Sequence, residues 1–363
     1  MVFTDPVKLS IVIPTFNSLP FIERLVEGIL LASAAPDEIV FVDAFSKDGT
    51  YEFICESRFP CPVSILQREP NGVYDAWNYG IQNATGEWIM VACADDLVYP
   101  RIFERIRSAE ALVSTGDGII AWAIDIINEE GKRLDTVPDP TPSAFLGRLP
   151  KDTVCRLDAD AEALLIYLLR GYRVSFMSMV FRRQVWGEQP FRTDMGASAD
   201  IEWLLEAHLR GWDTLQLPEI LAAWRSRSAS VTGGSSRMSR IEAHQQLQRQ
   251  TIKRIREKLR LPPNASRQLE MMRPATNVYD YIRAVYEAPG LLERCSMLYG
   301  AISTAGMLNF LCLALKRAGI LRSWKFFKPL EQARVIAGES FFPDAICAVS
   351  EAPVTNQKVE VLR

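Results

Sequence analysis

Four short apolar runs alternate with amphipathic segments over the first hundred residues. The runs are rich in β-branched residues and predict buried strands at residues 8–13, 38–42, 63–66 and 88–92. The segments between them carry apolar residues at helical spacing and predict helices at residues 19–32, 51–58 and 73–84. This alternation predicts an α/β fold in which flanking helices cover a mostly parallel central sheet.

Acidic residues follow two of the predicted strands. Asp43 comes after the second strand, and the pair Asp95 and Asp96 comes after the fourth. The carboxyl ends of parallel strands form the edge at which open α/β sheets bind ligands. A carboxylate pair there suits a divalent cation, which takes one or two protein oxygens together with substrate phosphates. The alternative is a solvated loop in which one Asp caps the next helix.

Several classes of protein are disfavoured by what the chain lacks. Neither a GxGxxG nor a GxxxxGKS/T motif follows the first predicted strand, which argues against dinucleotide dehydrogenases and P-loop enzymes. Seven cysteines form no CxxC pair and there are two histidines, so a zinc site is not expected. The cysteine pattern predicts a reducing, cytoplasmic compartment, and the first ten residues are not expected to be a signal peptide.

Charge is unevenly distributed along the chain. The formal net charge is −3 over 363 residues, yet residues 237–328 contain 17 Lys and Arg against 6 Asp and Glu. Such an excess predicts an anionic partner for the last third, either a membrane surface or nucleic acid.

An uncharged run of 21 residues, 295–315, lies within this basic part of the chain. The segment that follows it, 316–328, interleaves Lys and Arg with Trp and Phe. Basic and aromatic residues together favour a helix that lies in an anionic headgroup layer, so residues 295–328 are expected to contact a membrane surface. A packed helix or oligomer contact and a membrane-spanning helix are the alternatives.

Four motifs occur in the order and spacing of one enzyme family. They are IVIPTFN (11–17), VDAFSKDGT (42–50), EPNGVYDAWNYGIQNATGEW (69–88) and ACADD (92–96). Over residues 8–232 the chain resembles the inverting family 2 glycosyltransferases of GT-A fold, in particular the colanic-acid-type branch of bacterial surface-polysaccharide transferases. The resemblance implies a nucleotide-diphosphate sugar as donor, UDP-linked first and GDP-linked as the alternative, with Mn²⁺ or Mg²⁺ as cofactor.

For the metal, the resemblance implies that Asp96 is a ligand and that Asp95 either shares the metal or contacts the ribose. The family usually has an Asp two positions before this pair, where this chain has Cys93. Because a neutral thiol is a poor ligand for Mg²⁺, Cys93 is expected to be a small buried residue.

For the nucleotide, the resemblance implies contacts from the turns after the first two strands. Asp43 would accept a hydrogen bond from the base, Phe16 would stack on the base, and Arg225 would grip the diphosphate. Helix capping is the alternative role for Asp43, and a solvated helix face is the alternative for Asp75. The full set of expected donor-binding residues is Pro14, Thr15, Phe16, Asn17, Asp43, Gly72, Asp75, Asn78, Asp95 and Arg225.

The second half of the region that resembles the family contains a candidate base. Asp200 lies at the start of a predicted helix, after a small-residue segment, and the resemblance implies that it is the catalytic general base. Helix capping is the alternative role for Asp200, and Glu202 is the alternative base. Arg227 stands where relatives often have a metal-binding His, and a guanidinium cannot bind a metal.

These expectations divide the chain into a GT-A domain at residues 1–235, a basic helical region at 236–350 and a tail at 351–363. Within the domain, residues 1–125 would bind the nucleotide and residues 126–235 the acceptor.

The expected activity is metal-dependent, inverting transfer of a hexose to a saccharide or lipid-linked saccharide in polysaccharide biosynthesis. The expected location is the cytoplasm or the inner face of the cell membrane. Nucleic acid is not expected as a partner, and oligomerisation stays open. The alternative function, favoured by Cys93 and Arg227, is a catalytically degenerate nucleotide-sugar-binding or scaffold protein.

Overall fold

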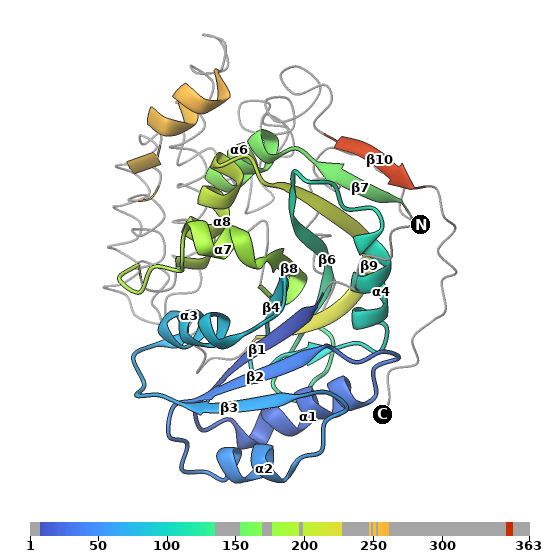
Figure 1. Cartoon of the computed structure of the whole chain (residues 1–363), viewed down its shortest axis with the longest axis vertical. Coiled ribbons are helices and arrows are strands. Elements are labelled where there is room, and N and C mark those ends of the chain that lie inside the picture. The colour runs from blue at the N-terminus through green and yellow to red at the C-terminus, as the bar shows by residue number, and fades with distance from the viewer. Residues whose placement is uncertain are drawn as a thin grey trace, which may run out of the picture.

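One central sheet runs through the protein. The structure is a computed structural model that describes residues 8–134, 153–168, 176–195, 199–226, 247, 250–251, 253–260 and 346–350. Within this part, nine strands follow the order β10-β7-β9-β6-β8-β4-β1-β2-β3, and the short strand β5 (Leu97–Val98) pairs with β9 beside this path. Figure 1 shows helices on both faces of the sheet, which confirms the expected α/β layers.

The first half of the sheet is parallel. Its strands are β1 (Leu9–Thr15), β2 (Glu38–Asp43), β3 (Val63–Gln67) and β4 (Trp88–Val91). Side chains alternate between the faces, so Val12 and Val40 pack with α3 (Val73–Asn83), whereas Ile11 and Ile39 pack with α1 (Leu19–Leu30). Helix α2 (Thr50–Glu56) contributes to the same cluster as α1. These seven elements agree with the predicted ones to within two residues at most ends.

Helix α3 approaches β1 closely because residue 80 is Gly. A Cβ there would lie 2.3 Å from Val12 Cγ1, far inside the contact distance of two non-bonded carbon atoms. Gly80 therefore sets the distance between the sheet and the helix that carries Asp75 and Asn78.

The second half of the sheet is mixed. Strand β8 (Met179–Arg182) inserts antiparallel between β4 and β6 (Asp117–Ile127), and β6 is parallel to β9 (Asp213–Arg225). Strands β7 (Val154–Leu157) and β10 (Ile346–Ser350) extend the sheet antiparallel beyond β9. The sheet is thus parallel where strand and helix alternate locally, and mixed where strands distant in sequence meet.

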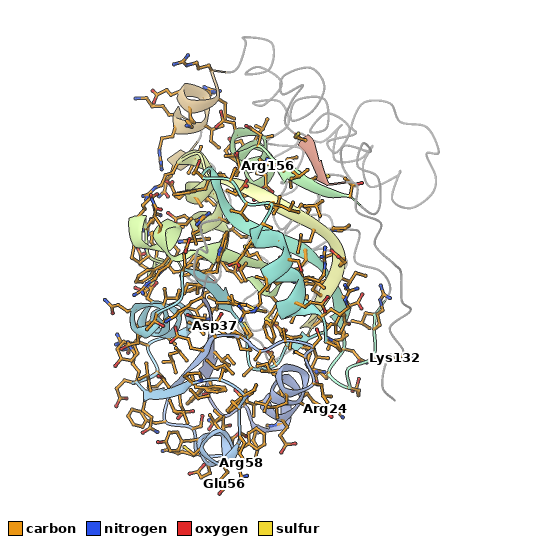
Figure 2. The ribbon with its side chains drawn as sticks, turned by 45° about the vertical axis from the view of Figure 1, so that its right-hand side comes forward. Arg24, Asp37, Glu56, Arg58, Lys132 and Arg156 are labelled. Carbon is orange, nitrogen blue, oxygen red and sulfur yellow. The ribbon has the colours of Figure 1, made fainter. Side chains whose placement is uncertain are left out.

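A partly buried ion pair joins β7 to the start of β6 in this second half of the sheet. Arg156 on β7, labelled in Figure 2, donates two hydrogen bonds of 2.8 Å to the buried carboxylate of Asp117 at the start of β6. Because the pair is bidentate, it fixes the register between distant strands as well as compensating the buried charge.

The helices of the second half are mostly buried. They are α4 (Ile102–Glu110), α6 (Ala159–Leu168), the 3₁₀ turn η1 (Phe176–Ser178), α7 (Arg183–Glu188) and α8 (Ala199–Leu209). Helix α8 is buried from Glu202 to Leu209, so the core encloses it on most sides although it carries Glu202, Glu206 and His208. It packs on α6 and begins next to the residue predicted as catalytic base.

Two parts of the predicted C-terminal region pack onto the sheet domain. Residues 253–259 are helical, Ile255 and Leu259 are buried with α8, and Arg254 donates to Glu206 at 2.7 Å. Strand β10 pairs with β7. The predicted boundary at residue 235 stays a prediction. Residues 295–328, Arg227 and the tail at 351–363 lie outside the described residues, and among the described helices none has the length and apolarity needed to cross a bilayer.

Candidate functional site

The turns after β1, β2 and β4 meet at one edge of the sheet. Thr15 and Asp43 pair across the last rung of β1 and β2, and β4 pairs with β1 on its other side. The predicted donor-binding turns and the Asp95–Asp96 pair therefore share the carboxyl edge, as expected for a parallel sheet.

The Asp43 carboxylate is fully buried and held by three donors. The hydroxyls of Thr15 and Ser46 donate to it at 2.9 and 2.6 Å, and the Ser46 backbone N–H donates at 3.0 Å. The Ser46 contacts form a local turn, and the Thr15 contact links this turn to β1. Asp43 does not cap α2, because that helix begins at Thr50 after the cap residue Gly49. The carboxylate is consequently rigid, as a group that reads a base must be.

Asn17 fastens the turn after β1 to the turn after β2. Its side-chain oxygen accepts from the Lys47 N–H at 2.9 Å, its own N–H donates to the Ser46 hydroxyl at 2.9 Å, and its φ of 48° is left-handed. Pro14 lies within β1 opposite Val42. Asn17 thus has a clear structural role at the position predicted for donor binding.

Two aromatic rings stand exposed on these turns. Phe16 is 57% exposed and Phe45 is 43% exposed, and Phe45 adopts a φ of 54°, which is rare for a bulky residue. Exposed rings on two turns at a ligand-binding edge are suited to stacking on a planar base. Sequence reasoning found Phe16 and missed Phe45. The feature that singles out Phe45 is its left-handed backbone conformation, which only the structure reveals.

Cys93, Asp95 and Asp96 form a candidate metal site. The Cys93 sulfur and one carboxylate oxygen from each Asp all lie within 4.8 Å of one another, and in the described part of the chain no other such group of three is found. Protein ligands bind divalent cations at about 2.0–2.6 Å, so atoms spaced in this way can share one ion. The donor set therefore fits a divalent cation, and it includes a thiol that was expected to be only a packing residue.

Arg225 at the end of β9 positions this group. Its backbone N–H donates to Asp96 at 2.8 Å, and its guanidinium donates to the carbonyl oxygens of Asp95, Asn128 and Glu129 at 2.7, 2.9 and 2.7 Å. The residue is 4% exposed. The predicted contact with a diphosphate thus competes with three carbonyl contacts, and the observed partners make Arg225 a residue that holds the metal-site turn against β9.

Asp200 begins α8 and meets α3 through Tyr74. Its carboxylate accepts from the Ile201 N–H at 2.7 Å, and it hydrogen-bonds the buried Tyr74. Burial, followed by the negative charge of Asp200, raises the pKa of Tyr74, and Cys93 adds to this effect. Tyr74 therefore links the predicted base with the metal site, and sequence reasoning missed it because the residue reads as an ordinary core position.

The three predicted residues on and before α3 differ in their surroundings. Gly72 has a φ of 98°, and a Cβ there would meet nothing within 4 Å, so the backbone is open to a ligand. Asp75 instead makes a bidentate pair with Arg68 at 2.5 and 2.9 Å. Asn78 donates to the Phe191 carbonyl at 2.7 Å and accepts from the Phe191 N–H and the Trp186 indole at 3.0 and 2.9 Å. The Asn78 amide thus joins α3 to the segment before α8.

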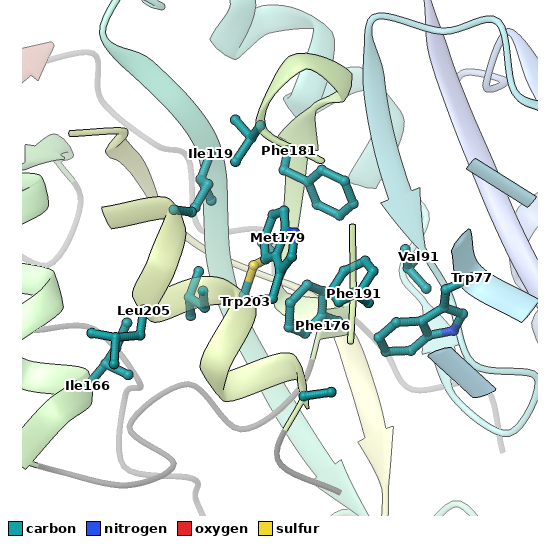
Figure 3. Close-up of a cluster of buried hydrophobic side chains, with 14 of the residues drawn as sticks. Trp77, Val91, Ile119, Ile166, Phe176, Met179, Phe181, Phe191, Trp203 and Leu205 are labelled. Carbon is teal, nitrogen blue, oxygen red and sulfur yellow. The ribbon is translucent and has the colours of Figure 1, made fainter. Parts of the chain in front are cut away.

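An aromatic cluster supports this junction. Figure 3 shows Phe176, Phe181, Phe191 and Trp203 packed together, with Trp77 beside them, and the Phe181–Trp203 centroids lie 4.7 Å apart. The alternative base, Glu202, faces Gln189 and Arg192 beside this cluster. Burial of such rings contributes about 2 kcal/mol each, so the start of α8 is firmly placed relative to α3.

The sequence of this chain is similar to those of known glycosyltransferases. The family described as "Glycosyl transferase family 2" matches residues 10–183. The chain is 27% identical over 203 residues to the succinoglycan biosynthesis protein ExoO of Rhizobium meliloti, which covers 55% of this chain and 54% of that protein. It is 34% identical over 92 residues to a PGL/p-HBAD biosynthesis glycosyltransferase of Mycobacterium bovis, covering 25% and 36%. The chain thus spans about half or less of the length of these curated relatives.

Solved structures share the fold. S. aureus TarS in complex with UDP-GlcNAc superposes with a TM-score of 0.56 at 14% identity, covering 92% of this chain and 91% of that one. The mannosyltransferase PcManGT of Pyrobaculum calidifontis, in complex with GDP-Man and Mn²⁺, gives a TM-score of 0.51 at 20% identity, covering 92% and 86%. The predicted GT-A architecture is thereby confirmed.

Proposed function

We propose that this chain, whose residues 10–183 match glycosyl transferase family 2, belongs to that family and transfers a sugar from a nucleotide-diphosphate donor to a saccharide or lipid-linked saccharide, with inversion. The single observation that carries the proposal is the junction at Tyr74. This side chain brings the base candidate Asp200 to the edge that also holds Asp43 and the Cys93–Asp95–Asp96 group. In this proposal, one edge of the sheet carries the base, the metal ligands and the carboxylate that contacts the nucleotide.

The proposed donor site uses the two turns at the ends of β1 and β2. The rigid Asp43 carboxylate would accept a hydrogen bond from the imide or amide edge of the base, and the exposed rings of Phe16 and Phe45 would stack on it. A divalent cation at Asp95 and Asp96 would stabilise negative charge on the departing diphosphate. The open backbone at Gly72 gives the donor room to approach α3.

Asp200 would act as general base in this proposal. Its carboxylate would remove the proton of the acceptor hydroxyl while that oxygen bonds to the anomeric carbon and the diphosphate leaves from the opposite face. A single displacement of this kind inverts the configuration at that carbon. The Tyr74 hydroxyl holds the carboxylate in place, and Ile201 N–H fixes one of its oxygens.

The comparisons support the substrate classes without selecting among them. One structural neighbour binds UDP-GlcNAc and another binds GDP-Man with Mn²⁺, so UDP- and GDP-sugars are both candidate donors and Mn²⁺ is a candidate cofactor. A relative named for succinoglycan biosynthesis supports a polysaccharide or its lipid-linked precursor as acceptor.

A donor screen tests the proposal. We expect binding and slow hydrolysis of at least one UDP- or GDP-sugar with Mn²⁺, and Asp200→Asn should lower turnover by about 10²–10⁴-fold while nucleotide binding persists. Asp194→Asn is the matched control because Asp194 is exposed and pairs with Arg192 alone among the contacts described. Equal activity in Asp200→Asn and the wild type would contradict the base assignment.

A second candidate function is nucleotide-sugar binding without turnover, as in a scaffold of a polysaccharide assembly. The departure at Cys93 from the usual acidic residue favours it. Nucleotide binding with no transfer or hydrolysis, unchanged by Asp200→Asn, would support this function and contradict the first.

We also propose that residues 295–328, which end in a basic and aromatic segment, bring the protein to an anionic membrane surface, which supports a location at the inner face of the cell membrane. We expect the full chain to co-sediment with vesicles that contain anionic lipid, and less so at high salt. A truncation before residue 294 should lose this binding, and equal sedimentation of both proteins would contradict it.

A further inference from the structure

We propose that the Cys93 thiolate is a direct ligand of the divalent cation, together with Asp95 and Asp96, and that it makes the site select thiophilic cations over Mg²⁺. The inference rests on the proposed function, and it deepens that function by naming which cation the site takes. It revises the expectation that Cys93 only fills space.

The geometry supplies the first argument. The Cys93 sulfur lies within 4.8 Å of a carboxylate oxygen from each Asp, and these two oxygens also lie within 4.8 Å of each other. Ions bind thiolate sulfur at about 2.3 Å and carboxylate oxygen at about 2.0–2.2 Å, so a sulfur and an oxygen on one ion are separated by at most about 4.5 Å. The observed upper limit of 4.8 Å is close to this separation, so the three atoms lie near enough to share one ion.

The backbone supplies the second argument. The Asp96 N–H donates to the Cys93 carbonyl at 3.1 Å, which closes a tight turn. Arg225 holds the other side of this turn through the Asp95 carbonyl and the Asp96 carboxylate. The three ligands are therefore pre-organised by contacts that do not depend on a bound ion.

The surroundings of Cys93 supply the third argument. Cys93 is only partly buried, it packs against the hydrophobic core that includes Tyr74, and its sulfur is not in a disulfide. It also influences Tyr74, the side chain that contacts Asp200. The sulfur thus lies beside the carboxylate pair and remains partly accessible, as a metal ligand at this edge must be.

The chemistry of sulfur determines the selectivity. Binding of M²⁺ by the thiol forms the sulfur–metal bond and releases the thiol proton to solvent. Mg²⁺ prefers oxygen ligands in octahedral geometry. Thiolate is a softer ligand, and it binds Co²⁺, Zn²⁺ and Cd²⁺ more strongly than it binds Mn²⁺. We therefore expect the affinity for Co²⁺ and Cd²⁺ to be high, that for Mn²⁺ intermediate and that for Mg²⁺ low.

Absorption spectroscopy of the Co²⁺-loaded protein tests the assignment without measuring activity. The full-length wild type is titrated with Co²⁺ in the presence of UDP or GDP, and we expect visible d–d bands together with a near-ultraviolet band from thiolate-to-Co²⁺ charge transfer. Cys93→Ser should lose the charge-transfer band and bind Mn²⁺ about tenfold more weakly, with a smaller change for Mg²⁺. Cys55→Ser is the control for stray binding, because Cys55 is exposed on α2, and it should keep both bands.

The outcomes separate this inference from the proposed function. Nucleotide-dependent d–d bands without a charge-transfer band in the wild type would overturn the Cys93 assignment and leave the metal-dependent function standing. No nucleotide-dependent cation binding at all would overturn both. Cadmium NMR on the wild type gives a second readout that needs no variant: a shift in the range of sulfur-bound Cd²⁺ supports the inference, and a shift in the all-oxygen range overturns it.

Discussion

Asp96 performs two tasks with one side chain. It accepts a hydrogen bond from the Arg225 N–H at 2.8 Å, and it belongs to the candidate metal ligands. Asn in its place keeps a carbonyl oxygen for the hydrogen bond but loses the negative charge. We expect Asp96→Asn to lower the transfer rate about 100-fold or more while the thermal unfolding midpoint changes little. Initial rates with Mn²⁺ and a thermal melt check this, and a rate close to that of the wild type would contradict the metal role.

At the scale of residues, sequence reasoning did well where the neighbouring strand sets the position of a side chain. It placed Asp43 after the second predicted strand, and Asp43 ends β2 opposite Thr15 on β1. It did less well for Arg225, whose carbonyl partners lie 96–130 positions away in the chain. It missed Tyr74 altogether, since a Tyr on an apolar helix face predicts only packing.

Helix α3 is the element that connects the two halves of the site. Asn78 satisfies two polar groups of Phe191 and the indole of Trp186, and these segments lead directly into α8. Asn78→Ala would leave those groups unpaired, so we expect a loss of about 1–3 kcal/mol in the free energy of unfolding. Because α8 carries Asp200, we also expect kcat to fall more than the donor KM rises.

Urea unfolding and steady-state kinetics measure these two effects. Asn83→Ala is the matched control on the same helix, because Asn83 is exposed and donates to the Tyr79 carbonyl within its own helix. Equal effects of the two substitutions would contradict the role of Asn78 in positioning α8.

The whole molecule carries a pH-sensitive carboxyl at the end of the sheet far from the donor turns. Burial, together with the charges of Asp158 and Asp117, raises the pKa of Asp213 to about 6, although the Ala159 N–H donates to it at 2.9 Å. A raised pKa means that the folded state binds this proton more tightly than the unfolded state. Protonated Asp213 therefore makes its whole contribution to the free energy of unfolding below the ordinary pKa near 4, and this contribution is lost as the pH rises through 6.

Asp213→Asn should remove this loss. Asn keeps an oxygen that accepts from Ala159, so we expect the variant to gain about 1–2 kcal/mol in the free energy of unfolding at pH 7.5 and much less at pH 4. Denaturant unfolding at the two pH values measures this, with Glu56→Gln as an exposed control at the end of α2. The same gain at both pH values would contradict the assignment of the effect to Asp213 titration.

The sequence alone determined the parallel half of this protein and the edge that carries its candidate site. Strand alternation and helical spacing are set by neighbours within about four positions, and the residues that follow a strand must lie at its end. Thr15, Asp43 and the Asp95–Asp96 pair were placed in this way.

The tertiary structure decided the remainder. It alone inserts β8 between β4 and β6, adds β10 to the sheet, turns Asn78 toward Phe191 across 113 positions and brings Tyr74 to Asp200. Such contacts depend on which buried surfaces fit one another once the chain has collapsed, and no local period in the sequence records that choice.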